Sequence, residues 1–221
     1  MSTIHSFTEE NYLKAIYHLS SGNNSVVSTN QIAEITNTKA ASVTDMLKKL
    51  AEKKLINYIK YQGVTLTEAG KNAAVNIVRK HRLWEVFLVE KLGFKWDEVH
   101  DIAEELEHIN SESLINRLDD FLGNPAADPH GDPIPDRSGT IHQKKLVRIS
   151  DMHQDQNGTI SGVSEHSSVF LKLLEKMGLT LGTKIRISEL IEFDGSIILI
   201  VNDHADRTIS REVAKNILVM L

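Results

Sequence analysis

All four prolines of this 221-residue chain lie in one short segment, which divides the sequence into two parts of different periodicity. The segment, residues 123–139, reads GNPAADPHGDPIPDRSG. Because proline lacks a backbone donor and fixes φ, the segment cannot continue a helix, and we predict an irregular linker. Before it, apolar residues recur at helical spacing; after it, they alternate or form short runs separated by glycines. We therefore expect a mainly α protein with α+β parts, in which a helical front precedes a small β-barrel.

The start of the chain has the element order of a winged helix-turn-helix. We predict a helix capped by Thr8 that ends at the loop SSGNNS, a short helix with Ile35 facing inward, and a third helix over Ala40–Lys54. Two strands follow, Ile56–Tyr61 and Val64–Thr67. The alternative is a small helical domain with an incidental hairpin.

In a winged helix-turn-helix, the third helix presents its N-terminal face to the major groove of DNA. Small hydroxyls and a cation suit phosphates and base edges there. A carboxylate repels phosphate, although it can accept a hydrogen bond from a cytosine amino group. The residues predicted to contact DNA are Lys39, Ala41, Ser42, Thr44 and Asp45.

The net charge of −5 conceals an uneven distribution along the chain. Residues 1–80 carry ten Lys/Arg against six Asp/Glu, residues 81–140 carry five against fourteen, and residues 141–221 carry ten of each. A basic start, an acidic middle and a neutral end suggest three modules with different partners. We predict a DNA-binding domain over residues 1–72, a helical domain over 73–140 and the barrel over 141–221.

Several classes of protein are disfavoured by what the sequence lacks. Cysteine is absent, so disulfides, thiolate ligands and a thiol nucleophile are excluded. The sequence has no apolar run long enough to span a membrane, and its start does not resemble a signal peptide, so we expect a cytoplasmic protein with no membrane partner. Neither a P-loop nor a Ser/His/Asp arrangement is present, and we predict that the chain is not an enzyme and has no small-molecule substrate.

The acidic middle contains a concentration of histidines and carboxylates. We predict a helix over Lys95–Ile109, in which VHDIAEELEHI places His100, Glu104, Glu107 and His108 on one stripe, opposite its apolar residues. Like charges at this spacing destabilise a helix, and a divalent cation would reverse that penalty. The preceding helix, predicted over 67–93 with a break near Gly70, offers His81 and Glu85 four residues apart.

Two neighbouring helices that each offer histidine and carboxylate favour a metal site over an ordinary solvated face. Oxygen and imidazole ligands without sulfur suit Mn(II) or Fe(II) better than a thiolate zinc site. Glu105 and His108 also match half of a di-iron carboxylate motif, but the second half is absent, which leaves an oxidase as a distant alternative.

Taken together, these motifs resemble the diphtheria toxin repressor and manganese transport regulator family of bacterial metal-dependent repressors. The resemblance is carried, in order, by TEENYLKAIY, KAASVTDMLKKL, RKHRLWE, VHDIAEELEH and HGDPIP, and the tail is similar to the SH3-like domain of the longer members. It implies a transcriptional repressor of metal uptake genes in which the helical domain binds metal and forms a homodimer, here around Trp84, Val86 and Phe87. Such a dimer would bind a pseudo-palindromic double-stranded operator.

The resemblance also implies two metal sites, and thus up to two ions per subunit. Its primary site would comprise Asn11, Glu104, Glu107 and His108. Its ancillary site would comprise His81, Glu85 and His100, with a tail ligand at Glu165 or His166. Iron-type members place a cysteine where this chain has Glu104, so Mn(II) is favoured over Fe(II); Asn11 departs from the usual aspartate of manganese-type members. The alternatives are an iron-dependent repressor of the same family, a winged-helix regulator not gated by metal, and a metalloenzyme.

Overall fold

The computed structural model describes residues 5–20 and 25–221, which form two compact units. The first unit consists of the residues up to His81, Glu104–Arg117 and Pro135–Thr140. The second unit consists of Arg82–Ala103, Leu118–Ile134 and Ile141–Leu221. Residues 1–4, where no signal peptide was predicted, and residues 21–24 of the predicted SSGNNS loop lie outside the described residues. Within the described ranges, no helix is both long enough and apolar enough to cross a membrane.

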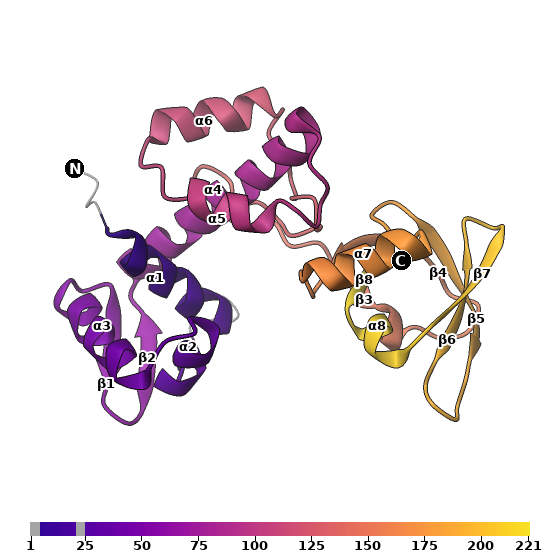
Figure 1. Cartoon of the computed structure of the whole chain (residues 1–221), viewed down its shortest axis with the longest axis horizontal. Coiled ribbons are helices and arrows are strands. Elements are labelled where there is room, and N and C mark those ends of the chain that lie inside the picture. The colour runs from indigo at the N-terminus through magenta and orange to yellow at the C-terminus, as the bar shows by residue number, and fades with distance from the viewer. Residues whose placement is uncertain (1–4, 21–24) are drawn as a thin grey trace. The chain divides into compact units, whose positions relative to one another are not determined.

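The first unit contains the predicted winged helix-turn-helix (Figure 1). Its elements are α1 (Phe7–Leu19), α2 (Thr29–Ile35), α3 (Ala40–Glu52), β1 (Ile56–Ile59) and β2 (Gly63–Leu66). The two strands pair antiparallel, with Ile56 opposite Leu66. Fully buried apolar side chains from all three helices form the core: Leu13, Ile16, Ile32, Val43, Leu47 and Leu50. Their helical spacing in the sequence is the pattern that predicted these helices.

Some local predictions within this domain are wrong. Ser6, not Thr8, caps α1, because its side chain accepts a hydrogen bond from the backbone of Glu9 while Glu9 binds back to the Ser6 backbone. Ile35 was expected to face inward, but 52% of it is exposed, because it is the last residue of α2 and faces away from the core. Both strands end one or two residues earlier than predicted.

The next helix, α4 (Glu68–Leu92), is continuous, so the predicted break at Gly70 is wrong. Gly70 is required for packing instead. A Cβ at this position would lie 1.9 Å from the carbonyl oxygen of Leu55, so only glycine allows the helix to approach the start of β1 this closely. Two shorter helices follow, α5 (His100–Leu106) and α6 (Glu112–Phe121). Helix α5 therefore begins five residues later than predicted and ends before Glu107.

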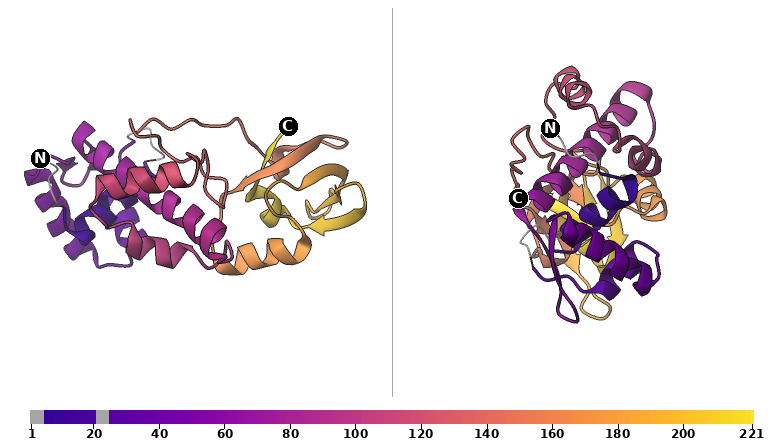
Figure 2. Two further views of the ribbon diagram at one scale, coloured as in Figure 1. Left: turned by 90° about the horizontal axis from the view of Figure 1, so that it is seen from above. Right: turned by 90° about the vertical axis from the view of Figure 1, so that its left-hand side faces the viewer.

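Between α6 and the tail, the chain has no helix or strand over residues 122–146, as the proline-rich sequence predicted (Figure 2). The tail then forms a small antiparallel β domain. Its elements are β3 (Val147–Arg148), η1 (Ile149–Asp151), β4 (Asn157–Val163), α7 (Ser168–Met177), β5 (Lys184–Leu190), β6 (Ile197–Val201), β7 (Ala205–Ile209), α8 (Arg211–Lys215) and β8 (Ile217–Met220). The strands form a six-stranded sheet in the order β3-β8-β4-β5-β6-β7, and α7 packs its buried Leu171 and Leu174 into the domain core.

Candidate metal centres and DNA-binding face

A cluster of charged side chains lies in the first unit, where α1, α4 and the end of α5 meet. We call it the first cluster; its residues are Glu10, Lys14, His81, Glu104, Glu107 and His108. The ligand atoms of His81, Glu104 and Glu107 all lie within 4.8 Å of one another. Glu107 and His108 were expected on a helix face opposite the packed side; both are buried, because they lie in the turn after α5 and point toward α1 and α4.

The carboxylate of Glu107 is at the centre of the first cluster and is 0% exposed. Its Oε2 accepts a 2.6 Å hydrogen bond from Nδ1 of His81 and a 2.8 Å hydrogen bond from Nζ of Lys14. Burial raises the pKa of Glu107, but the hydrogen bond from His81 and the charge of Lys14 outweigh burial and lower it below its ordinary value. Glu107 is therefore held as an anion.

The imidazole of His108 is held in place by a second carboxylate. Its Nδ1 donates a 2.6 Å hydrogen bond to Oε2 of Glu10 on α1, and its ring stacks on Phe7 at 4.5 Å between centroids. The tautomer follows from this partner, and it leaves Nε2 as the atom with a free lone pair. That Nε2 lies 4.0 Å from Oε1 of Glu107. A carboxylate that orients an imidazole in this way is a common feature of metal-ligating histidines.

The donor set of the first cluster fits a hard divalent cation. Oε1 of the fully buried Glu107 lies 2.7 Å from Nζ of Lys14 and 4.0 Å from Nε2 of His108. Glu104 adds a second carboxylate on the same side. Oxygen and imidazole ligands without sulfur suit Mn(II) or Fe(II). Asn11 is exposed on α1, and no contact recorded in the described ranges joins its side chain to this cluster.

The second unit contains a separate group of ionisable side chains, the second cluster, formed by Glu85, His100, Asp128 and His130. The ligand atoms of Glu85, Asp128 and His130 lie within 4.8 Å of one another. Glu85 is 2% exposed, with Oε1 3.7 Å from Nδ1 of His100 and Oε2 3.6 Å from Nδ1 of His130. His130 donates its other ring hydrogen to the carbonyl oxygen of Trp96 at 2.7 Å, so Nδ1 is its atom that faces the carboxylates.

The electrostatics of the second cluster favour a cation. Burial, together with the neighbouring Glu85 and Asp132, raises the pKa of Asp128 to about 7, although Arg82 and His130 act in the opposite direction. Burial lowers the pKa of His130, but its hydrogen bond to Glu85 and the charge of that residue raise it overall. Like charges in a buried site repel one another, and a divalent cation between them would remove the repulsion.

Local backbone structure explains why Asp128 and His130 reach Glu85. Oδ1 of Asp128 accepts hydrogen bonds from the backbone of His130 and Asp132, which closes the loop into a turn. Gly131 then adopts φ +92°, and a Cβ there would lie 2.2 Å from the carbonyl oxygen of Ser161 on β4. Only glycine permits this close approach of the loop to the sheet.

The two predicted tail ligands lie in different environments. The ring of His166 stacks on that of His130 with centroids 4.9 Å apart, so it lies beside the second cluster. Glu165 is exposed and accepts a 2.8 Å hydrogen bond from the backbone of Ser167, the residue that caps α7. The structure therefore places His166, rather than Glu165, next to the candidate ligands.

The predicted DNA-contacting residues lie at the exposed N-terminal part of α3. Lys39, Ala41, Ser42 and Asp45 are exposed. The hydroxyl of Thr44 donates to the carbonyl oxygen of Ala40 at 2.9 Å, and Asp45 forms a 3.1 Å ion pair with Lys48 that offsets its negative charge. This face therefore presents cations, a free serine hydroxyl and little uncompensated negative charge.

The chain matches three known families in the order of its modules. It matches "Iron dependent repressor, N-terminal DNA binding domain" over residues 6–64, "Iron dependent repressor, metal binding and dimerisation domain" over residues 67–136, and "FeoA domain" over residues 147–221. A solved structure described as a manganese-dependent transcriptional repressor in complex with manganese is 36% identical, with a TM-score of 0.86, and the match covers 96% of this chain and 99% of that one. The chain belongs to the iron-dependent repressor family.

Curated relatives agree with this assignment. The iron-dependent repressor IdeR of Mycobacterium leprae is 28% identical over 217 residues, which cover 94% of each chain. The diphtheria toxin repressor of Corynebacterium jeikeium is 30% identical over 128 residues, 58% of this chain and 53% of that protein. The resemblance inferred from the sequence motifs is confirmed, and so is the expectation of a metal-dependent DNA-binding repressor rather than an enzyme.

The dimerisation domain of this family member has an aromatic surface in the second unit. The ring of Trp84 packs edge-on against Phe87, and Phe87 lies 6.5 Å from Phe121 between centroids. Phe121 is 65% exposed and Leu92 is 56% exposed. Val86, which was expected beside Trp84 at the dimer contact, is buried within its own chain.

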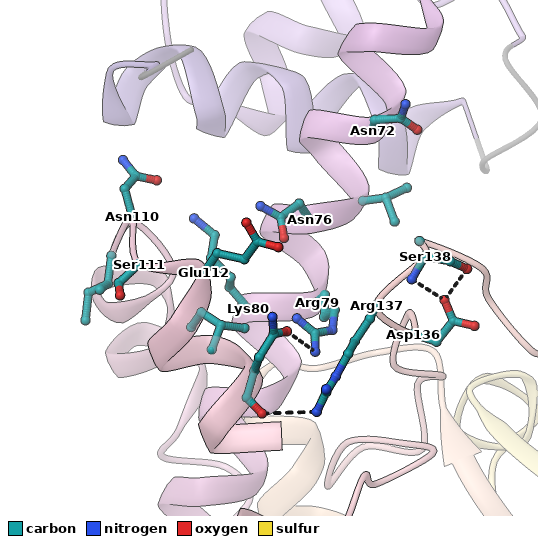
Figure 3. A pocket seen from close by; sticks show the side chains of 15 residues that line it. Asn72, Asn76, Arg79, Lys80, Asn110, Ser111, Glu112, Asp136, Arg137 and Ser138 are labelled. Atoms are coloured by element: carbon teal, nitrogen blue, oxygen red, sulfur yellow. Dashed lines mark hydrogen bonds between the residues drawn. The ribbon is translucent and has the colours of Figure 1, made fainter. Parts of the chain in front are cut away.

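A polar pocket of about 400 Å³ lies in the first unit, apart from the predicted ligands (Figure 3). It is lined by parts of α4, the start of α6 and residues 136–139. Asn116 connects two arginines there: its Oδ1 accepts from Arg79 and its backbone oxygen accepts from Arg137, both at 3.2 Å. None of the predicted metal ligands lines this pocket.

The sequence did not identify four residues of the two clusters: Glu10, Lys14, Asp128 and His130. Glu10 and Lys14 are four residues apart on α1 and flank the position predicted as a ligand, a signal that helical spacing could have provided. Asp128 and His130 lie in the irregular linker, where no periodicity indicates which side chains converge.

Proposed function

We propose that this repressor is activated by Mn(II), with Fe(II) as the alternative ion, and controls metal uptake genes in the cytoplasm as a homodimer on a pseudo-palindromic operator. Glutamate at position 104 and the absence of cysteine support Mn(II). The manganese-bound relative, similar over nearly its whole length, supports the same ion. The exposed aromatic surface around Phe121 supports the homodimer.

The observation that carries this proposal is the environment of Glu107. Its buried carboxylate lies where Lys14 of α1, His81 of α4 and Glu104 of α5 converge, and both of its oxygens lie within 2.8 Å of Nζ of Lys14. A buried anion of this kind requires cationic partners. We assign Glu104, Glu107 and His108 to the primary site, with Asn11 kept from the family pattern. His81 joins them, because its Nδ1 donates a hydrogen bond to Glu107 and its ligand atom lies within 4.8 Å of those of Glu104 and Glu107.

We assign the ancillary site to the second cluster. Glu85 and His100 are retained from the sequence prediction, and Asp128 and His130 are added because their ligand atoms converge on Glu85. His166 is the preferred tail ligand over Glu165, since its ring lies against His130. The chain would then bind two ions, one in each unit.

Helix α1 provides the physical connection between the primary site and the DNA-reading helix. Glu9 accepts hydrogen bonds from Nζ of Lys53 at the end of α3, at 2.7 and 2.8 Å, while the next residue, Glu10, holds His108. A bound divalent ion supplies positive charge where Glu104 and Glu107 meet. The arrangement in which α1 is docked on the acidic residues is then favoured, and α3 is held in one orientation.

The test begins with operator selection from a pool of random duplexes in the presence of Mn(II). Binding to the selected duplex is then titrated with Mn(II), Fe(II) under anaerobic conditions, Zn(II) or chelator. We expect tight binding with Mn(II) and loss of binding on chelation. Binding that is indifferent to the chelator would show a winged-helix regulator that metal does not gate.

Variants separate the two sites. Glu104→Ala and His108→Ala should abolish the metal response, whereas Glu105→Ala, an exposed carboxylate on the same helix, should retain it. His130→Ala should lower the number of Mn(II) ions bound per chain from two to one, as counted by calorimetry and elemental analysis. A metal response that survives Glu104→Ala would contradict the primary-site assignment.

A further inference from the structure

Lys14 is the lysine of the first cluster, and, like Glu10, it was not identified as part of a metal site from the sequence. Its side chain projects from α1, and only 12% of it is exposed. The ammonium donates hydrogen bonds to Oε1 of Glu104 and, at 2.8 Å, to Oε2 of Glu107, and it lies 2.7 Å from Oε1 of Glu107. It therefore contacts both carboxylates proposed as primary ligands.

An ammonium cannot share this position with a divalent ion. It has three donors and no lone pair, so it cannot act as a ligand. It occupies the space between the two carboxylates and repels a second cation there. Glu107 is fully buried, and a buried carboxylate that lost its cationic partner would be strongly destabilised. Lys14 therefore supplies, in the absence of metal, the positive charge that the cluster requires.

We propose that Lys14 is an internal competitor of the metal ion: its ammonium must leave Glu104 and Glu107 before both can bind the ion, and this competition sets the metal concentration at which the repressor responds. The proposal rests on the proposed function, because it assumes that these two carboxylates are ligands. The flexible four-carbon side chain allows Lys14 to withdraw without movement of α1. The ammonium of Lys14 and the metal ion compete for the same carboxylates. A stronger contact of Lys14 with Glu104 and Glu107 therefore lowers the apparent affinity for the metal by the same factor.

Binding isotherms for Mn(II) test the competition. Lys14→Met keeps the length and apolar part of the side chain but removes the charge, and it should tighten Mn(II) binding at the primary site about tenfold, since two charge-assisted hydrogen bonds no longer have to be broken. The metal-free variant should also unfold at a lower temperature, and saturating Mn(II) should restore more of its thermal stability than it adds to the wild type.

Two control variants separate competition from general electrostatics. Lys80 is buried on α4 and interacts electrostatically with Glu10 and Glu107. Unlike Lys14, it forms no hydrogen bond to Glu104 or Glu107 among the described residues. Lys80→Met therefore reports the effect of removing a nearby charge. Lys215→Met removes an exposed lysine paired with Glu212 in the tail and should leave affinity unchanged. A Lys14→Met effect no larger than that of Lys80→Met would overturn the proposal.

A labelling experiment tests the displacement in the wild-type chain and does not depend on the folding of any variant. The acetylation rate of Lys14 by an amine-reactive reagent is measured by mass spectrometry with and without Mn(II). The buried, ion-paired ammonium should react slowly without metal and at least severalfold faster with it, while exposed Lys215 keeps the same rate. An unchanged or slower rate at Lys14 under saturating Mn(II) would overturn the proposal.

Failure of the underlying function gives a different result. If wild-type and Glu104→Ala chains bind Mn(II) identically, the primary site is wrong, and the proposed function fails along with the role of Lys14. If Glu104→Ala loses the ion but Lys14→Met binds it no more tightly than the wild type, the site stands and only the competition is rejected.

Discussion

Two adjacent carboxylates on α1, Glu9 and Glu10, contact different partners: Glu9 contacts the recognition helix and its end, and Glu10 contacts a candidate metal ligand. Glu9 receives Lys53 and Lys49 from α3, and Glu10 receives His108. Successive residues on a helix are about 100° apart, which is why neighbours in the sequence can serve separate contacts. One turn of α1 therefore joins the recognition helix to a candidate metal ligand.

Glu10 should act on metal affinity through His108. Glu10→Gln removes the negative charge that accepts from Nδ1, while keeping the size of the side chain. Loss of such an orienting carboxylate typically costs about 10–100-fold in metal affinity. We expect a loss of that order for Mn(II) at the primary site by calorimetry, with ion binding at the second cluster unchanged. Equal affinities in Glu10→Gln and wild type would show that Glu10 does not orient the ligand.

Glu9 should make the DNA-binding domain sensitive to acid. Burial would raise the pKa of Glu9, but hydrogen bonds from Lys53, the Ser6 backbone and Lys49 lower it to about 2. A depressed pKa in the folded state means that the stabilisation is complete above the ordinary pKa near 4.5 and is lost as pH falls from there toward 2. The shift corresponds to about 3 kcal/mol at neutral pH.

Hydrogen exchange of α1 and α3 amides, followed by mass spectrometry from pH 5 to pH 2.5, measures this effect. In Glu9→Gln the protection should be lower at pH 5 and should fall less steeply with acid than in the wild type. Glu34→Gln, at an exposed position on α2, serves as the control and should follow the wild type. Parallel profiles for Glu9→Gln and wild type would contradict the prediction.

At the scale of single residues, helical spacing predicted candidate ligands that lie four residues apart, and it gave no sign of Asp128 and His130, which lie outside the helices. His81 with Glu85, and His100 with Glu104, are visible because spacing of four places them on one face. Asp128 and His130 converge with Glu85 only through the turn around Gly131, which is a tertiary contact. No pattern within the linker could have predicted that convergence.

At the scale of elements, α3 begins without the usual side-chain cap. Its N-cap is Lys39, in an extended conformation that suits a cap but with no hydrogen bond from its side chain. A serine at this position would stabilise a helix by about 0.5–1 kcal/mol. A lysine there is favourable only if its charge serves another purpose, and a DNA phosphate is the partner proposed here.

Lys39→Ser should therefore raise stability and weaken DNA binding at the same time. We expect the free energy of opening of α3, measured by hydrogen exchange of its amides, to rise by about 0.5–1 kcal/mol. The slope of the logarithm of the operator-binding constant against the logarithm of salt concentration should become shallower by about one unit. Lys39→Ala is the matched control, with the same loss of DNA affinity but without the added cap. A Lys39→Ser chain with wild-type salt dependence would remove Lys39 from the DNA interface.

The elements themselves follow from the sequence to different degrees. Periodicity predicted α1 to α4 close to their observed bounds, because each buries an apolar stripe. It extended α5 too far in both directions, because Trp96 and Glu107 fit the helical pattern but lie in turns. The last strands and α8 were not predicted, since β7 carries alternating polar residues and β8 is only four residues long.

At the scale of the whole molecule, the exposed aromatic surface predicts association of two chains. Phe121→Glu places a charge on the most exposed ring of this surface. In an apolar interface an unpaired charge is costly, so the variant should sediment as a monomer at concentrations where the wild type is a dimer. Glu112→Gln, an exposed change at the other end of α6, is the control. A dimeric Phe121→Glu chain would place the interface elsewhere.

The His, Asp and Glu side chains whose ligand atoms converge at the two candidate metal centres are carboxylates and imidazoles, in a chain without a single thiol. Thiolate ligands are the groups that peroxides convert to sulfenic acids and disulfides. Carboxylates and imidazoles cannot form sulfenic acids or disulfides, so oxidation of thiols would leave these candidate ligands unchanged. DNA binding by this repressor would then depend on the concentration of the ion, even under conditions that oxidise proteins with thiolate ligands.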